Sequence, residues 1–143
     1  MATTMMFVNL PVKNLELSMA FFKRLGFQFN PQFTNEQAAC MIVSETSYVM
    51  LLVEDFFKTF VDKPLVDATR ATEVLVCLSA EDRAGDDAMV AKAVAAGGKA
   101  HRTPVDHGFM YGHGFTDPDG HQWEVMFMEA SAVEPVAATA SAK

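Results

Sequence analysis

Two glutamates, Glu73 and Glu124, lie in segments whose other residues are mostly apolar. Side chains alternate between the two faces of a strand, so Glu124 shares a face with Met126, and Glu73 shares one with Leu75 and Cys77. If both carboxylates lie in one cleft, like-charge repulsion and partial desolvation raise the pKa of at least one. Such a pair is typical of a proton donor and acceptor. The alternative is that Glu73 simply begins a strand in solvent.

A glycine-rich segment, residues 106–115, contains His107, Tyr111 and His113 and leads into a strand. Glycine lets the backbone approach a ligand closely, or it simply permits turns. We therefore take His113 as a candidate catalytic group, beside the alternative that loop histidines are structural.

Other reaction centres lack their motifs. The chain has no G-x-S-x-G elbow, no phosphate-binding P-loop and no paired C-x-x-C. The remaining histidines, His101 and His121, are expected at the surface. Cys40 and Cys77 stand in apolar segments, where a free thiol behaves as a small hydrophobe, so a reducing compartment is expected.

Composition narrows the class of protein. The chain has 143 residues, of which 50% are hydrophobic and 20% charged, as in a globular domain. Its net charge of -7 argues against nucleic acid or an anionic membrane as a partner. The N-terminal residues lack the pattern of a signal peptide, so a cytoplasmic location is expected.

The candidates must be positioned by two similar runs of elements. The first run is a strand at 7–12, a helix at 15–25 that Asn14 caps and Gly26 ends, and strands at 27–33, 38–43 and 48–53. The second is a strand at 73–78, a helix that begins in an acidic cluster and ends at Gly97, and strands at 99–103, 112–116 and 121–128. The turn Asp117-Pro-Asp-Gly120 precedes the last strand.

This repetition predicts an α+β fold of two tandem βαβββ modules that form a curved mixed sheet around a cleft. The modules are expected at residues 1–54 and 73–129, with a connector that carries a short helix at 55–72 and a flexible tail at 130–143. In the connector, Phe56, Phe57 and Phe60 either cover the cleft or seal the junction between halves. The expected pocket residues are Phe7, Asn9, Met50, Phe56, Leu75, Cys77, Tyr111 and Met126.

Three stretches together resemble the vicinal oxygen chelate superfamily, which includes glyoxalase, bleomycin-resistance and extradiol-dioxygenase proteins. They are the strand and helix from Val8 to Phe27, the segment Ala95-Ala-Gly-Gly98, and Phe115-Thr-Asp-Pro-Asp-Gly-His-Gln-Trp-Glu-Val125. The resemblance implies four metal-ligand positions, which fall on Phe7, Met50, Glu73 and Glu124. Only Glu73 and Glu124 carry an oxygen donor, whereas zinc, nickel, manganese or iron in a catalytic site generally has more protein ligands.

Two functions follow from the resemblance. One is a small-molecule-binding protein with a degenerate metal site and no metal ion, in which a cationic group of the ligand pairs with Glu73 or Glu124. The other is a metal-dependent lyase, isomerase or ring-cleaving dioxygenase, in which a divalent ion held by the same glutamates stabilises an anionic species. The resemblance also implies a homodimer that uses the edge near Phe7–Val12.

Overall fold

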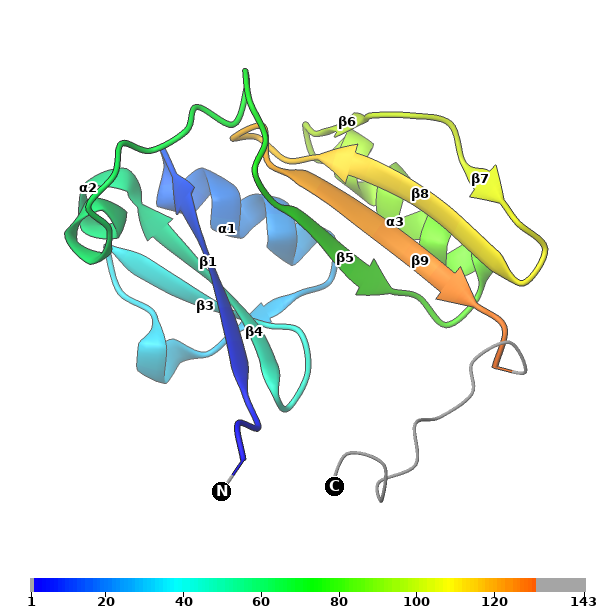
Figure 1. The fold of residues 1–143 in the computed structure, drawn as a ribbon, viewed down its shortest axis with the longest axis horizontal. Helices are drawn as coiled ribbons and strands as arrows, with labels where there is room; N and C mark the ends of the chain where they lie inside the picture. Colours follow the sequence, from blue (N-terminus) through cyan, green and yellow to red (C-terminus); the bar gives the residue numbers. More distant parts are fainter. Residues whose placement is uncertain (1, 131–143) are drawn as a thin grey trace.

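The computed structural model describes residues 2–130, which form an α+β fold of two βαβββ halves (Figure 1). The first half contains β1 (Met6–Val12), α1 (Leu15–Arg24), β2 (Gln28–Phe29), β3 (Ala38–Ile42) and β4 (Ser47–Val53). The second half contains β5 (Leu75–Ser79), α3 (Arg83–Ala95), β6 (Lys99–Ala100), β7 (Val105–Asp106), β8 (Met110–Thr116) and β9 (Gln122–Met128). The connector carries α2 (Glu54–Phe57) and a 3-10 turn. Apart from Ala130, the expected tail lies outside the described residues.

Two predicted strands differ in extent from those observed. The strand predicted at 27–33 is only Gln28–Phe29, because the side chain of Asn30 caps a 3-10 turn that begins at Pro31. The strand predicted at 73–78 begins instead at Leu75, so Glu73 precedes it.

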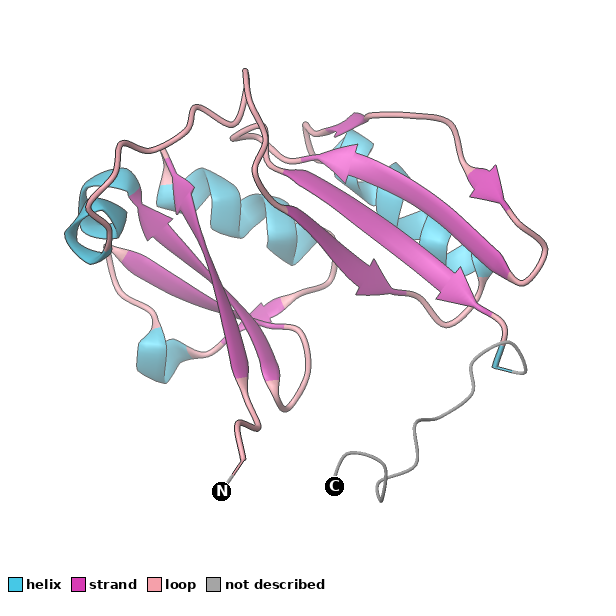
Figure 2. Cartoon of the chain, viewed as in Figure 1, coloured by secondary structure: helices cyan, strands magenta, loops and turns pink. Residues whose placement is uncertain are grey.

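The strands form two separate sheets rather than one continuous curved sheet. The first has the order β1-β4-β3-β2, and the second has the order β5-β9-β8-β6, with β7 also paired to β8. In both halves the opening strand runs parallel to the closing strand, which confirms the internal repeat. Figure 2 shows β1 and β5 at the edges of the two sheets that face each other.

The sequence determines where both long helices begin and end. The Asn14 side chain accepts a hydrogen bond from the Leu17 amide at the start of α1, and Asp82 does the same for the Gly85 amide in α3. Just after each helix, Gly26 and Gly97 adopt φ values of 106° and 105°, which other residues rarely tolerate. Both helix predictions are therefore confirmed.

One hydrophobic core spans the two halves. Phe22 of α1 lies against Trp123 of β9, with ring centroids 5.0 Å apart, and Phe21 lies 6.0 Å from Phe115 of β8. Phe22, Phe115 and Trp123 are fully buried. The helix of the first half thus packs against the sheet of the second, and burial of these aromatic rings stabilises both.

The predicted turn at residues 117–120 closes on itself. The Gly120 amide donates to the Asp117 carbonyl, and Gly120 has φ 92°. The buried carboxylate of Asp117 accepts from the indole Nε1 of Trp123, at 3.0 Å, and from the amides of Asp119 and His121. The turn therefore fixes the start of β9 and the orientation of Trp123.

The same turn also joins the halves. The Asp119 carboxylate accepts hydrogen bonds from the Lys13 amide at 2.8 Å and from the hydroxyl of buried Ser18 at 2.9 Å. The imidazole Nε2 of His121 donates to the Pro11 carbonyl, 2.6 Å away. His121 is buried, so its predicted position at the surface is wrong. Its hydrogen-bond partner, Pro11, is 110 residues away in the sequence, so the residues around His121 do not reveal this contact.

Among residues 2–130, no helix combines the length and the apolar composition that crossing a bilayer requires.

Replacing Asp119 with alanine is expected to lower the free energy of unfolding by about 1–3 kcal/mol, because the buried Ser18 hydroxyl and the Lys13 amide lose their acceptor. Urea denaturation followed by the fluorescence of Trp123, the only tryptophan, measures the change. Asp62→Ala, which removes an exposed carboxylate from the connector, is the matched control. Equal stability of the two variants would contradict the role assigned to the turn.

Candidate functional site

Glu124 is a buried carboxylate whose charge is compensated by two neighbours. Its side chain is 5% exposed. One oxygen lies 3.0 Å from Nε2 of His101, and the other forms an ion pair with the guanidinium of Arg102. No local pattern indicates this contact, because both partners follow a strand of only two residues. His101 is predicted at the surface, but only 18% of its side chain is exposed.

Gly114 provides the space for this arrangement. It lies opposite Glu124 in the register of β8 and β9, and its carbonyl accepts from the His101 amide. A Cβ at position 114 would overlap Nε2 of His101 and Oε2 of Glu124. The glycine therefore permits close approach of two protein side chains.

Glu124 lies between two neighbouring strands: Gly114 of β8 is its partner on one side, and Cys77 of β5 is its partner on the other. Cys77 is exposed, although partial desolvation and the nearby carboxylates of Glu124 and Asp86 raise the pKa of its thiol. By strand alternation, Leu75 and Met126 share this face of the sheet, as predicted. The face thus combines one compensated charge with apolar side chains and a thiol.

Glu73 does not join Glu124. It is exposed, and it precedes by four residues the Cys77 that lies opposite Glu124. Glu73 lies in a bend before β5 rather than in the strand itself. Glu73 lines a cavity that Glu124 does not line, so the structure does not place the two carboxylates in one cleft.

Tyr111 and His113 are on the opposite face of the second sheet from Glu124. His113 is the partner of Val125, which belongs to the buried core, whereas Gly114 is the partner of Glu124. The hydroxyl of Tyr111 donates to Asp87 of α3 at 2.6 Å, and this bond raises the pKa of Tyr111 to about 12. Both side chains therefore lie under α3.

The predicted residues of the first half present no charged or imidazole ligand. Phe7 stacks on Tyr48 with ring centroids 4.9 Å apart, and Met50 is paired with Asn9 in the register of β1 and β4. The side-chain amide of Asn9 donates to the Phe7 carbonyl, 3.3 Å away. This face is mainly apolar.

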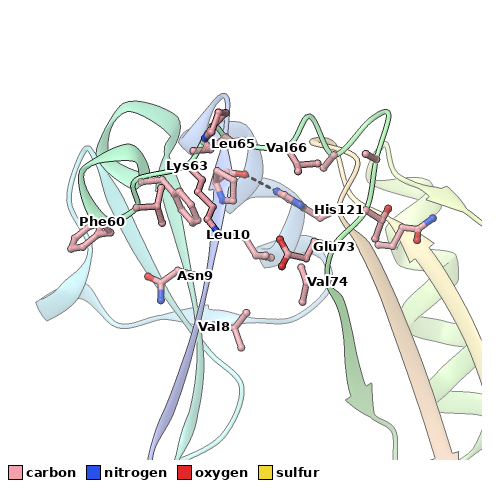
Figure 3. A pocket seen from close by; sticks show the side chains of 18 of the residues that line it. Val8, Asn9, Leu10, Phe60, Lys63, Leu65, Val66, Glu73, Val74 and His121 are labelled. Carbon is pink, nitrogen blue, oxygen red and sulfur yellow. Dashed lines mark hydrogen bonds between the residues drawn. The ribbon is translucent and has the colours of Figure 1, made fainter.

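A cavity of about 1190 Å³ lies where β1, the connector and the residues before β5 meet. Of the predicted site residues, Asn9 and Glu73 line it, and Phe57 and Phe60 of the connector line it too. Phe56 packs on Phe60, with ring centroids 5.1 Å apart. Figure 3 shows Glu73, Val74 and His121 across the cavity from Phe60 and Lys63. Glu124 is not among the lining residues.

Asp86 is a second buried carboxylate, and it belongs to the acidic cluster predicted at the start of this helix. It is 0% exposed, and neither of its oxygens has a hydrogen-bond partner among the described residues. Burial, with smaller contributions from Asp87 and Glu124, raises its pKa to about 7. Helical spacing was an available signal, since Asp86, Val90 and Ala93 are all on the buried side of α3.

Comparisons with known proteins agree with this geometry. The family model described as Bleomycin resistance protein-like N-terminal matches residues 4–44. A hypothetical protein from S. aureus is similar over 89% of this chain and 94% of its own, with 29% identity and a TM-score of 0.75. The comparison with curated proteins gave no match.

Two further solved structures share the fold. A glyoxalase-related enzyme from Fulvimarina pelagi has 21% identity and a TM-score of 0.74, covering 92% of this chain and 91% of its own. Lactoylglutathione lyase from Agrobacterium tumefaciens has 16% identity and a TM-score of 0.62, covering 88% of this chain and 94% of its own. The family-model match over residues 4–44 and the shared fold of both halves support the assignment to the vicinal oxygen chelate superfamily that the sequence predicts.

Proposed function

We propose that the protein binds a small amphipathic molecule, in the cavity between β1 and the residues before β5, without a metal ion at the family positions. The observation that carries this proposal is the state of Glu124. Its carboxylate is buried, and both of its oxygens already have partners in His101 and Arg102. A metal ion at Glu124 would have to displace the guanidinium.

The other three family positions point the same way. The side chains of Phe7 and Met50 have no nitrogen or oxygen ligand atom, and Glu73 precedes by four residues the Cys77 that pairs with Glu124. Zinc, nickel and iron in catalytic sites generally have three or more protein ligands. These four positions therefore support binding over metal-dependent chemistry.

The cavity suits an amphipathic ligand. Val8, Leu10 and Phe57 give it apolar walls, while Asn9 and Glu73 offer polar contacts. Small-molecule sites commonly combine a mainly apolar lining with a few polar groups. Because the chain carries a net charge of -7, its field favours a ligand with a cationic group, which Glu73 would attract.

Bleomycin, a cationic amphipathic molecule suggested by the matched family model, is the first probe. We expect saturable binding by isothermal titration calorimetry, and Glu73→Gln should weaken it about twofold to fivefold, as loss of an exposed ion pair does. Glu36→Gln removes an exposed charge outside the cavity and should leave affinity unchanged. Equal weakening by both variants would indicate an effect of net charge rather than of the cavity.

We also propose that the protein forms a homodimer through β1 and β5. Within the part of the chain that the structure describes, each of these strands pairs on one side only, so both have an open edge. Exposed apolar side chains accompany both edges: Met6 is 62% exposed, Phe7 49% and Leu75 52%. Pairing between copies would cover these residues and satisfy the free edges.

Light scattering at micromolar concentration is expected to give the mass of a dimer. Leu75→Glu should shift the mass towards that of the 15.7 kDa monomer, because it places a charge in the proposed interface. Leu17→Glu, on the 55% exposed Leu17 of α1, is the matched control and should remain dimeric. A monomeric wild-type protein would refute the interface.

One observation favours the alternative, a metal-dependent lyase, isomerase or dioxygenase. His101 and Glu124 lie side by side at 3.0 Å, and imidazole with carboxylate is a common ligand pair for Zn²⁺ or Fe²⁺. If Arg102, whose side chain is 46% exposed, moves away, these two side chains offer the start of a metal site.

Glu124→Gln separates the two functions. Under the binding proposal, the variant should have the metal affinity of the wild-type protein in titrations with Mn²⁺, Fe²⁺, Ni²⁺ and Zn²⁺, because Arg102 already occupies the carboxylate. Glu36→Gln again serves as the control, and thermal unfolding verifies that both variants are folded. Loss of metal binding in the Glu124 variant alone would favour the enzyme.

A further inference from the structure

Three side chains that can bind a cation converge between α3 and β8, on the side of the sheet opposite Glu124. They are Asp86 and Asp87 in α3 and His113 in β8. One ligand atom from each residue lies within 4.8 Å of the other two. A helix and a strand hold these atoms, so their positions are defined by packed secondary structure rather than by a loop.

The tautomer of a neutral His113 follows from the contact that its Nε2 makes with the Arg102 carbonyl. Its Nε2 lies 3.0 Å from the Arg102 carbonyl, and because a carbonyl oxygen only accepts, Nε2 must carry the hydrogen. In the neutral imidazole, Nδ1 then has a free lone pair. Nδ1 is buried without a hydrogen-bond partner and lies 3.8 Å from Oδ1 of Asp87. This is the arrangement of a metal-binding histidine whose other nitrogen is anchored.

Asp86 supplies an independent observation. Both of its carboxylate oxygens are buried, and neither has a hydrogen-bond partner of normal geometry among residues 2–130. An isolated buried carboxylate is strongly unfavourable, so such a group binds a proton, pairs with a charge or coordinates a metal.

The surrounding groups do not supply the missing positive charge. The Tyr111 hydroxyl donates to Asp87 rather than to Asp86. The nearby guanidinium of Arg83 is bound to Asp106, Glu129 and the Gly108 carbonyl. The Tyr111 hydroxyl at Asp87 and the backbone amide of Phe127, which lowers the pKa of Asp86, are dipoles and bring no positive charge to the two carboxylates.

We propose that Asp86, Asp87 and His113 bind a divalent transition-metal ion of the Zn²⁺ type, which links α3 to β8. Two carboxylate oxygens and one imidazole nitrogen are a ligand set that Zn²⁺ accepts, with water completing the coordination. The ion neutralises the buried Asp86 charge. Because an unfolded chain lacks the assembled site, binding stabilises the folded second half.

The test uses the full chain, treated with a chelator and then titrated with ZnCl₂ by calorimetry, and with CoCl₂ by visible absorption. We expect one ion per chain, and an increase of roughly 5–10 °C in Tm when free metal is about a hundred times Kd. Asp86→Asn and His113→Gln should each weaken binding at least about tenfold, because each removes one of three ligands.

Matched controls distinguish this site from others. Asp62→Asn removes an exposed carboxylate and His107→Gln removes a histidine outside the cluster; neither should change the affinity. Circular dichroism verifies the fold of each variant, and two separate ligand variants protect the test if one does not fold. Absence of saturable binding in the folded wild-type protein, or binding unchanged in Asp86→Asn or His113→Gln, would overturn the proposal and assign a proton to the cluster.

Discussion

The two halves of the chain are tied together by the carboxylates of one turn. Asp117 holds the indole of Trp123, and Asp119 holds the Lys13 amide and the Ser18 hydroxyl of the first half. Both carboxylates are buried, so they need hydrogen-bond donors from within the protein. Each donor that they bind is thereby held in position. The Phe22–Trp123 contact, at 5.0 Å between ring centroids, then completes a core shared by both halves.

This turn also sets the chemistry of the second sheet. It determines where β9 begins, and a slip of one residue in β9 would exchange its two faces. With the observed register, Glu124 lies opposite Gly114 on one side and Cys77 on the other, while Val125 points into the core. That register determines the position of Glu124 and its contact with His101. It also places His113 on the other face of the sheet.

The sequence predicted what depends on nearby residues. The helix ends at Asn14, Gly26 and Gly97, the turn at 117–120 and the alternation in β9 are all local patterns, and the structure has each of them. The pairing of Glu73 with Glu124 was a prediction about two strands far apart in sequence. It failed because an overlay of repeats leaves the register between strands open, and here the register shifts Glu73 four residues away. His101 was missed for a related reason, since the two-residue strand before it has no detectable period.

Four buried carboxylates illustrate how this acidic chain tolerates charge in its interior. Asp117 and Asp119 are satisfied by N–H and O–H donors, and Glu124 is satisfied by a guanidinium and an imidazole. Asp86 is equally buried but has neither kind of partner. A fold that compensates three such groups so completely would gain nothing from leaving the fourth uncompensated, because an unpaired buried charge opposes folding. Asp86 is therefore neutralised either by a proton, which a pKa raised to about 7 permits, or by the cation that we propose His113 and Asp87 help to hold.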